Sequence, residues 1–345
     1  MVFIRADSNQ FIAGGHISRC IAIASELKEQ GEAVCFLVAD DNPVPALSKA
    51  GFPFINLHSE WNDLMSDVTY VKSVLKKERT PVLLIDTYQI SRRYVEELKS
   101  CCRIAYLGSK DEYLGPLDWL INYSTDIDYD FYNTSYDEQT ELLLGPAYAP
   151  IKKEFRNYLS IQKEKLGNIL ITTGNTNKNC IMEAIIEGLL PSVLEKPVTL
   201  HVVIGPMFEE KEKFHKAYDD CPNVILHENV KSMSDLMRNC DLAVSANGTT
   251  VYELSAIGLP TISFAMVPEQ VKSGETLSEL GVLDYCGQSF DHREECISLI
   301  KAKVNEYMYS IDKMNDLAER AHRFIDGKGC QRIVRILLKN SCSSN

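Results

Sequence analysis

The feature that most constrains this chain is a repeated alternation between short apolar runs and longer amphipathic segments. The apolar runs predict ten strands, at Val2–Ala6, Val34–Val38, Val82–Ile85, Ile104–Leu107, Trp119–Asn122, Ile169–Thr172, Val198–Ile204, Val224–Leu226, Leu242–Ser245 and Thr261–Phe264. Helical spacing predicts helices at His16–Gln30, Asp63–Lys77, Asn179–Leu189, Met207–Tyr218, Ser232–Asn239 and Thr249–Ile257. Continuous apolar strands that alternate with helices are typical of parallel sheets covered on both faces, so we predict an α/β, doubly wound fold.

The alternation breaks once, at Gly145–Lys165, where Gly145-Pro146 and Pro150 interrupt the pattern. A length of 345 residues also suggests two domains. We therefore predict a Rossmann-like domain over 1–150, a second over 151–310, and C-terminal helices over 311–345 that pack back on the first domain. Two such domains are expected to face each other across a cleft, with ligands at the carboxyl ends of the strands.

Charge and composition exclude several classes of partner. The net charge is −12, with no long run of basic residues, which disfavours binding to a nucleic acid polymer or an anionic bilayer. No apolar run is long enough for a membrane span, and no secretory signal is recognisable. The 11 cysteines are scattered without metal-ligand spacing, so we expect reduced thiols in a cytoplasmic protein. The oligomeric state stays open.

The segment Arg5–Arg19 follows the first predicted strand and opens the first predicted helix. Gly14 and Gly15 would let the backbone approach a ligand closely, and His16 would begin the helix on the cleft side. The helix dipole disfavours an imidazolium at that end, so we expect a neutral His16 that can accept a proton. The alternative is a tight turn with a structural role only.

The segment Ser245–Leu254 repeats this order of strand, small polar loop and helix. Three consecutive amides are expected to be exposed there: those of Gly248, Thr249 and Thr250. They would bind an anion without any Lys or Arg, and Glu253 could hold a vicinal diol such as ribose. The alternative is helix capping alone. The loop Val267–Gln270 follows the next strand and could line the same cleft.

Two further strand ends carry polar residues. Thr172–Asn177 opens the second domain and would either contact phosphate or cap the following helix. Asp86-Thr87-Tyr88 would point side chains into the cleft, although a tyrosine after a buried strand also serves packing. The Asp-x-Asp motif at Asp126–Asp130 is interpreted as a solvated acidic loop, and the histidines lack metal-binding spacing. We therefore predict neither a metal nor a cofactor.

Several of these segments together resemble a known family. They are Arg5-Ala6-Asp7 with Gly15-His16 and Arg19, Ile85–Tyr88, Gly145–Phe155, Thr173-Gly174, His227–Val230, Ser245–Glu253 and Glu269-Gln270. In this order they resemble the UDP-2,4-diacetamido-2,4,6-trideoxy-β-L-altropyranose hydrolases of pseudaminic acid biosynthesis, with related spore-coat polysaccharide proteins. That family has the GT-B fold, which consists of two Rossmann-like domains.

The resemblance implies roles for individual residues. His16 would be the general base that activates water, and Tyr88 would orient the water or the sugar. UDP would lie on the second domain, with its diphosphate near Gly248, its ribose on Glu253 and its uracil near Val230; Gln270 would contact sugar or phosphate. Further substrate-binding residues are predicted at Arg5, Asp7, Gly14, Gly15, Arg19, Asp86, Thr173, Gly174, Asn175, Ser245, Asn247, Thr249, Thr250 and Glu269.

The function expected from the sequence is hydrolysis of a UDP-activated amino-deoxy sugar to free sugar and UDP, without a metal. UDP is a good leaving group once its charge is met by helix amides, so one base would suffice. A glycosyltransferase with a UDP-sugar donor and a noncatalytic nucleotide-sugar-binding protein are the alternatives. The sequence differs from the family at Asn175, Asn177 and Glu269, so the identity of the sugar stays open.

Overall fold

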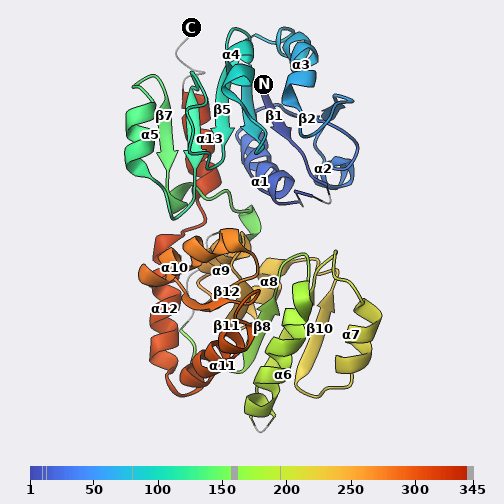
Figure 1. Cartoon of the computed structure of the whole chain (residues 1–345), viewed down its shortest axis with the longest axis vertical. Coiled ribbons are helices and arrows are strands. Elements are labelled where there is room, and N and C mark those ends of the chain that lie inside the picture. Colours follow the sequence, from blue (N-terminus) through green and yellow to red (C-terminus); the bar gives the residue numbers. More distant parts are fainter. Residues whose placement is uncertain (10, 13, 80, 157–161, 195, 340–345) are drawn as a thin grey trace. The chain divides into compact units, whose positions relative to one another are not determined.

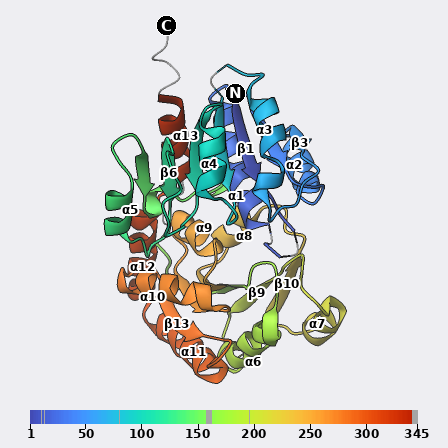
Figure 2. The same cartoon turned by 45° about the horizontal axis from the view of Figure 1, so that its top comes forward.

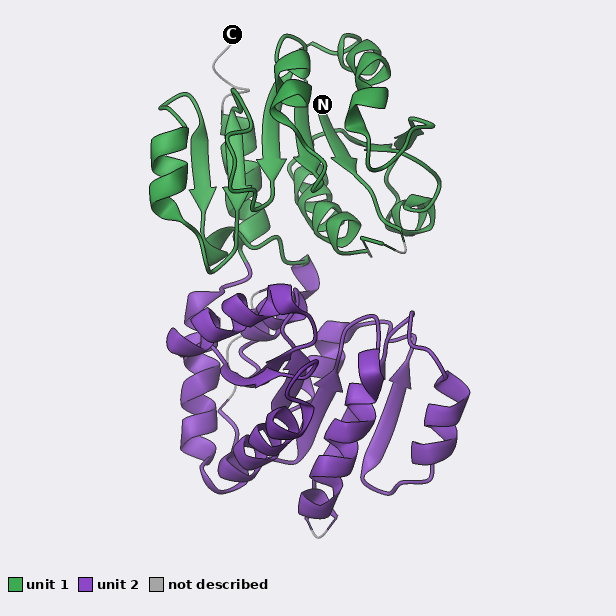
Figure 3. Ribbon diagram, in the orientation of Figure 1, with its two compact units in different colours: residues 1–152, 328–345 green, residues 153–327 purple. Residues whose placement is uncertain are grey.

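A computed structural model describes residues 1–9, 11–12, 14–79, 81–156, 162–194 and 196–339. The chain forms two compact units, one of residues 1–152 with 328–345 and one of residues 153–327 (Figure 3). Within these described ranges, no helix is both long and apolar enough to cross a membrane. The tail 340–345 lies outside the described residues, including the end of the helical segment predicted over 311–345.

The first unit is built on a seven-stranded parallel sheet in the order β3-β2-β1-β4-β5-β6-β7 (Figure 1). Its strands are β1 (Val2–Ala6), β2 (Val34–Val38), β3 (Phe54–Asn56), β4 (Val82–Asp86), β5 (Arg103–Leu107), β6 (Trp119–Asn122) and β7 (Glu141–Leu144). The order reverses between β1 and β4, which pair in register from Val2↔Val82 to Ala6↔Asp86. A doubly wound sheet binds ligands at this reversal, outside the carboxyl ends of the strands.

Alternate residues of these strands point to the two faces of the sheet. In β1, Val2, Ile4 and Ala6 face one core cluster, whereas Phe3 faces the other. The first face is covered by α1 (Gly15–Glu29), α2 (Val44–Ala50) and α13 (Gly329–Lys339). The second face is covered by α3 (Val68–Leu75), α4 (Arg92–Leu98) and α5 (Tyr129–Ser135). Apolar side chains on both faces explain why these strands read as continuous apolar runs.

The second unit repeats the arrangement with a six-stranded parallel sheet in the order β10-β9-β8-β11-β12-β13. The strands are β8 (Asn168–Thr172), β9 (Thr199–Ile204), β10 (Val224–Glu228), β11 (Leu242–Ala246), β12 (Thr261–Ala265) and β13 (Asp284–Gln288). The order reverses between β8 and β11. The loops that follow these two strands are therefore equivalent in position to those that follow β1 and β4.

Helices cover both faces of this sheet as well. They are α6 (Ile181–Val193), α7 (Lys211–Tyr218), α8 (Met233–Arg238), α9 (Thr250–Ile257), α10 (Val271–Glu279), α11 (Arg293–Tyr309) and α12 (Ile311–Phe324). The core cluster contains residues of α6, α7, α11 and α12. Helix α9 packs on β11 and β12 and contributes nothing to that cluster, so it covers the opposite face. Short 3₁₀ helices lie at Leu64–Ser66, Pro146–Tyr148, Lys153–Phe155, Lys178–Cys180 and Pro268–Gln270.

The chain returns to the first unit later than the sequence suggested. Helix α12 contacts α9 and is part of the second unit, and only α13 packs on α1 of the first (Figures 1 and 2). Ile333, Val334 and Leu337 of α13 are buried, and each contributes about 1.5–3 kcal/mol of hydrophobic stabilisation. Gly329 begins this helix because a Cβ there would lie 2.0 Å from the carbonyl oxygen of Ala149.

A histidine pair on the second sheet gives a pH-dependent stability. Nδ1 of His201 lies 2.9 Å from Nε2 of His227, and burial lowers the pKa of both rings. A lowered pKa means that, below pH 6.5, the unfolded chain binds protons that the folded chain does not. The melting temperature should therefore fall between pH 7 and pH 5.5, and the His201→Gln, His227→Gln variant should lose part of that fall.

His215 provides a control of opposite sign. Hydrogen bonding to Asp219 raises its pKa, so its stabilising contribution is present below pH 6.5 and is lost as the pH rises through the raised pKa. His215→Gln should therefore steepen the acid-side fall. Thermal unfolding of the three proteins by circular dichroism compares the slopes. An unchanged slope in the His201, His227 double variant would contradict the assignment.

Candidate functional site

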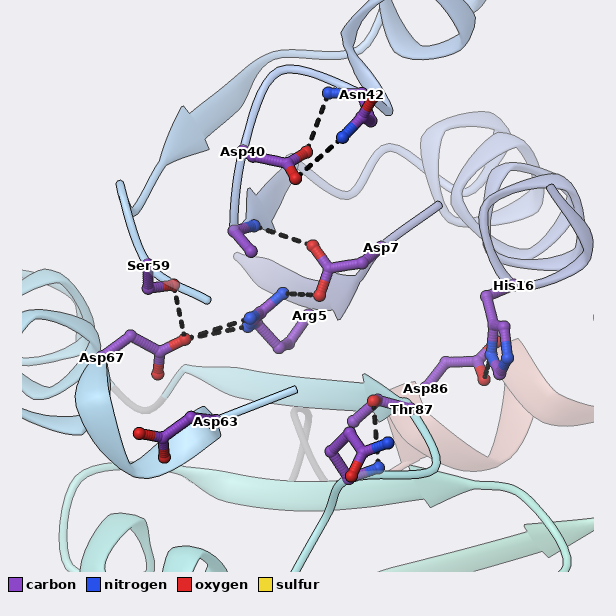
Figure 4. A network of polar contacts seen from close by, with 12 residues as sticks. Arg5, Asp7, His16, Asp40, Asn42, Ser59, Asp63, Asp67, Asp86 and Thr87 are labelled. Atoms are coloured by element: carbon purple, nitrogen blue, oxygen red, sulfur yellow. Dashed lines mark hydrogen bonds and ion pairs between the residues drawn. The ribbon is translucent and has the colours of Figure 1, made fainter. Parts of the chain in front are cut away.

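The reversal point of the first sheet brings His16 against Asp86. His16 is the second residue of α1 and Asp86 is the last residue of β4, 70 positions along the chain. Nδ1 of His16 lies 2.5 Å from Oδ1 of Asp86, and both side chains are buried (Figure 4). The contact exists because β1 and β4 pair directly, which places the loop after β1 beside the end of β4.

Arg19 supplies the positive charge that keeps Asp86 ionised. Its Nε donates to Oδ2 of Asp86 at 2.6 Å, its Nη2 donates to Oδ1, and its Nη1 donates to the hydroxyl of Tyr123 at 2.9 Å. Burial alone would raise the pKa of the Asp86 carboxyl, but the charge of Arg19 and hydrogen bonds from Arg19 and His16 lower it to about 2. Asp86 therefore carries a negative charge at neutral pH.

An ionised Asp86 fixes the proton on the His16 ring. A carboxylate only accepts hydrogen bonds, so the short contact with Asp86 is a hydrogen bond only if Nδ1 carries the proton when the ring is neutral. Nη2 of Arg19 also lies 3.0 Å from Nδ1, and in this tautomer it donates to Asp86 instead. The lone pair then lies on Nε2, which has no hydrogen-bond partner among the described residues. This is the arrangement of a general base that is oriented by a carboxylate.

The other groups beside His16 differ in exposure. The Tyr88 ring is 57% exposed and meets the His16 ring edge-on, with centroids 4.7 Å apart. Gly14 and Gly15 leave open space above their Cα atoms, where a Cβ would meet nothing within 4 Å. The Cys20 thiol lies 3.3 Å from Asp86, and burial raises its pKa well above the ordinary value, which favours the protonated thiol.

Arg5 and Asp7, predicted to bind substrate, are bound to other protein groups. Arg5 is fully buried; its Nη1 donates to Asp7, and its Nη2 donates to Asp67 at 3.0 Å (Figure 4). The other oxygen of Asp7 accepts the amide of Ala39 at 2.7 Å. Asp67 also accepts the hydroxyl of Tyr94 at 3.0 Å. These contacts favour a supporting role beneath the loop, and direct substrate contact by Arg5 or Asp7 stays a prediction.

In the second unit, the start of α9 partly matches the expected anion site. Thr249 and Thr250 present N–H groups with no hydrogen-bond partner among the described residues, as expected at a helix N-terminus. The expectation of an exposed Gly248 amide is wrong, because that N–H donates to the Ala246 carbonyl at 2.9 Å. The N-cap residue Thr249 makes no side-chain capping bond, so capping does not account for this loop.

The loop after β12 is tied to this helix start. Nδ2 of Asn247 donates to the carbonyl of Gln270 at 2.7 Å, and its Oδ1 accepts the Ser263 hydroxyl at 3.3 Å. A Cβ on Gly248 would lie 3.7 Å from Nε2 of Gln270, so that side chain lies over the loop. Asn247 and Gln270 are therefore brought together as predicted from their strand ends. Glu269 is exposed, and the buried Ser245 hydroxyl donates to the Ala246 carbonyl.

The loop after β8 is held by its own polar groups. The Thr173 hydroxyl donates to the carbonyl of Thr176 at 2.7 Å, and Gly174 has the positive φ of +78°. The loop passes so close to β9 that a Cβ on Gly205 would lie 2.3 Å from the Gly174 carbonyl oxygen. Asn177 accepts the amide of Met182 at 3.0 Å, so at this residue the capping alternative is realised. Gly174 and Asn175 are exposed.

Two further predicted residues are half-buried in the second unit. Glu253 is half-buried in the first turn of α9, and Val230 is half-buried after β10 at the edge of the sheet. In the acidic motif, Oδ1 of Asp128 accepts the amide of Phe131 and caps α5. Within the described ranges, no group of three or more His, Cys, Asp or Glu could hold a metal ion.

Three contributors were missed from the sequence. Tyr123 positions Arg19, while Asp67 and Tyr94 surround Arg5. Each lies far along the chain from its partner and outside any motif. Only the order of the strands could have brought them into consideration.

Two doubly wound parallel sheets, each with polar loops at its reversal point, define the GT-B fold. Solved structures of other proteins share this fold. The chain has a TM-score of 0.66 and 17% identity to MurG of Acinetobacter baumannii, over 98% of this chain and 99% of that one. It has a TM-score of 0.68 and 14% identity to a UDP-N-acetylglucosamine 2-epimerase, over 99% and 95%.

Sequence relatives confirm the resemblance that the motifs indicated. The chain is 24% identical to the UDP-2,4-diacetamido-2,4,6-trideoxy-β-L-altropyranose hydrolase of Campylobacter jejuni, over 67% of this chain and 80% of that protein. It is 22% identical to the spore coat polysaccharide biosynthesis protein SpsG of Bacillus subtilis, over 59% and 57%. An uncharacterised protein of Methanocaldococcus jannaschii is 24% identical, over 76% and 54%. A family model described as a protein of unknown function, DUF354, matches residues 140–276.

The chain thus spans only about half the length of two of these relatives, 54% and 57%. The activities of these relatives are therefore only proposals for this chain.

Proposed function

We propose that this protein is an enzyme that hydrolyses a UDP-activated amino-deoxy sugar at the anomeric carbon, giving free sugar and UDP, in the biosynthesis of a surface glycan. The observation that carries the proposal is the His16–Asp86 pair at the reversal point of the first sheet. The name of the Campylobacter relative supplies the substrate class, and the name of the Bacillus relative supplies polysaccharide biosynthesis.

His16 is the general base in this proposal. Its Nε2 takes a proton from water as the oxygen attacks the anomeric carbon, and the ionised Asp86 stabilises the imidazolium that forms. Tyr88, which contacts the His16 ring and is largely exposed, orients the water or the sugar. UDP departs as an anion and needs no proton from the protein.

The second unit holds the nucleotide. The unpaired N–H groups of Thr249 and Thr250 donate hydrogen bonds to the diphosphate, and the helix dipole of α9 favours its charge. Asn247 and Gln270 fix the loop beside it, and Glu253 receives the ribose hydroxyls. No step in this scheme uses a metal or a cofactor.

The decisive experiment measures UDP release from UDP-sugars without an added acceptor. Release that disappears in His16→Ala supports hydrolysis. If UDP is released only when an acceptor sugar or lipid is added, the enzyme transfers the sugar and does not hydrolyse the substrate. UDP binding without release under either condition would make the chain a binding protein.

The ribose assignment is tested separately by binding. Glu253→Ala should weaken the binding of UDP by about tenfold or more, since hydrogen bonds to a charged group contribute roughly 1.5–3 kcal/mol. Isothermal titration with UDP and with 2′,3′-dideoxy-UDP measures the effect. The dideoxy nucleotide should bind wild type and variant equally, and an unchanged affinity for UDP in Glu253→Ala would remove the assignment.

A further inference from the structure

A groove on the first unit lies on the opposite stripe of α1 from the His16 contacts. It runs between α1 and α2 and has a volume of about 410 Å³. Its lining includes Ile17, Ser18 and Ile21 of α1, Ala46 and Lys49 of α2, and Lys152. The volume falls in the range of small-molecule sites. His16, Arg19 and Cys20, which meet Asp86, are not among the lining residues.

The charge of this groove is its distinguishing property. Two ammonium groups, of Lys49 and Lys152, line it, and no Asp or Glu does. Among the described residues neither lysine has an ion-pair partner, whereas Lys72, Lys99 and Lys110 of the same unit each pair with a carboxylate. In a chain of net charge −12, two uncompensated lysines on one cavity make a local positive potential.

The rest of the lining is apolar or small. Ile17 is buried, and Ile21, Ala46 and Ala50 add aliphatic surface along the two helices. Ser8 and Ser18 add hydroxyl groups at the side. Gly14 opens one end, because a Cβ on it would meet nothing within 4 Å. The lining therefore combines an anion-attracting rim with an aliphatic floor.

We propose that this groove of the first unit binds an anionic ligand with a short aliphatic body, such as an alkyl phosphate or carboxylate. The ammonium groups of Lys49 and Lys152 meet the anion, and the aliphatic part lies along Ile17, Ile21 and Ala46. The proposal depends on the groove alone and holds whether the reaction at His16 is hydrolysis or transfer.

Binding of n-hexyl phosphate to the whole protein tests this proposal, with inorganic phosphate, hexanoate and 1-hexanol as comparisons. Hexyl phosphate should bind at least about tenfold more tightly than inorganic phosphate or hexanol, because it uses both the rim and the floor. Hexanoate binding as tightly as hexyl phosphate assigns a carboxylate ligand; weaker binding assigns a phosphate. Equal affinity for hexyl phosphate and inorganic phosphate would overturn the role of the aliphatic floor.

Variants locate the binding. The double variant Lys49→Ala, Lys152→Ala should weaken the binding of hexyl phosphate by about tenfold or more. Lys77→Ala changes an exposed lysine outside the groove and should leave the affinity for hexyl phosphate unchanged. Ala46→Trp fills the groove without removing charge and should also abolish binding. Circular dichroism, together with tryptophan fluorescence from Trp61 and Trp119 of the first unit, establishes that each variant is folded. Absence of binding by wild type, or binding insensitive to the double lysine variant and to Ala46→Trp, would overturn the proposal, while UDP release tests the reaction independently.

Discussion

Asp86→Asn should lower kcat for UDP release by roughly three to four orders of magnitude, the effect known for a misoriented catalytic histidine. The physical reason is the tautomer of His16. The amide of an asparagine can present its NH₂ group to Nδ1, which stabilises the proton on Nε2 and removes the lone pair that would accept a proton from water. The imidazolium formed during attack would also lose the neighbouring negative charge. Initial rates with a saturating UDP-sugar measure the loss.

Two further variants, His16→Ala and Tyr88→Phe, complete the test of the His16–Asp86 pair. His16→Ala should be at least as slow as Asp86→Asn, and the double variant should be no slower than His16→Ala, because the two residues act as one unit. Tyr88→Phe keeps the ring against His16 and removes only the hydroxyl. UDP affinity, which reports the second unit, should be unchanged in all of them. An Asp86→Asn enzyme that is folded and retains more than a tenth of kcat would exclude the proposed base.

The interior strands were predictable because both of their faces are buried. Val2–Ala6, Val34–Val38 and Trp119–Asn122 agree with the structure at both ends. The three strands that were missed, β3, β7 and β13, lie at sheet edges. An edge strand has fewer buried positions, and Asp284–Gln288 presents no apolar run. In β3 and β7 the apolar stretches are only two and three residues long, Phe54-Ile55 and Leu142–Leu144, and were not assigned as strands.

The candidate site, like the strands, could be predicted only where it depends on local sequence. Glycines, small polar residues and His16 at strand ends identified the loops, since ligands gather at the carboxyl ends of parallel strands. What those loops contact depends on strand order, which local spacing does not report. The partners of His16 and Arg5 lie 70 and 62 positions away, and the bond that occupies the Gly248 amide is a detail of turn geometry.

Arg5→Met should lower the free energy of unfolding of the first unit by about 3–5 kcal/mol, the effect of leaving buried charges without a partner. Arg5 is fully buried and binds both Asp7 and Asp67, so its removal leaves two buried carboxylates without the cation that they share. Tryptophan fluorescence reports this unit alone, because both tryptophans, Trp61 and Trp119, lie in it. Urea unfolding followed at this signal measures the change.

A second variant separates support from substrate contact. Arg5→Met combined with Asp67→Asn removes one of the stranded charges and should recover part of the stability, which a ligand-binding role for Arg5 would not require. Arg5→Lys keeps the charge without the planar fork, and should fall between wild type and Arg5→Met. If Arg5→Met instead unfolds like wild type while KM for the UDP-sugar rises, Arg5 contacts the substrate and the loop is supported by other groups. Because the loop after β1 leads into α1, which carries His16, the supporting role also predicts that kcat falls only as far as the folded fraction of the first unit falls.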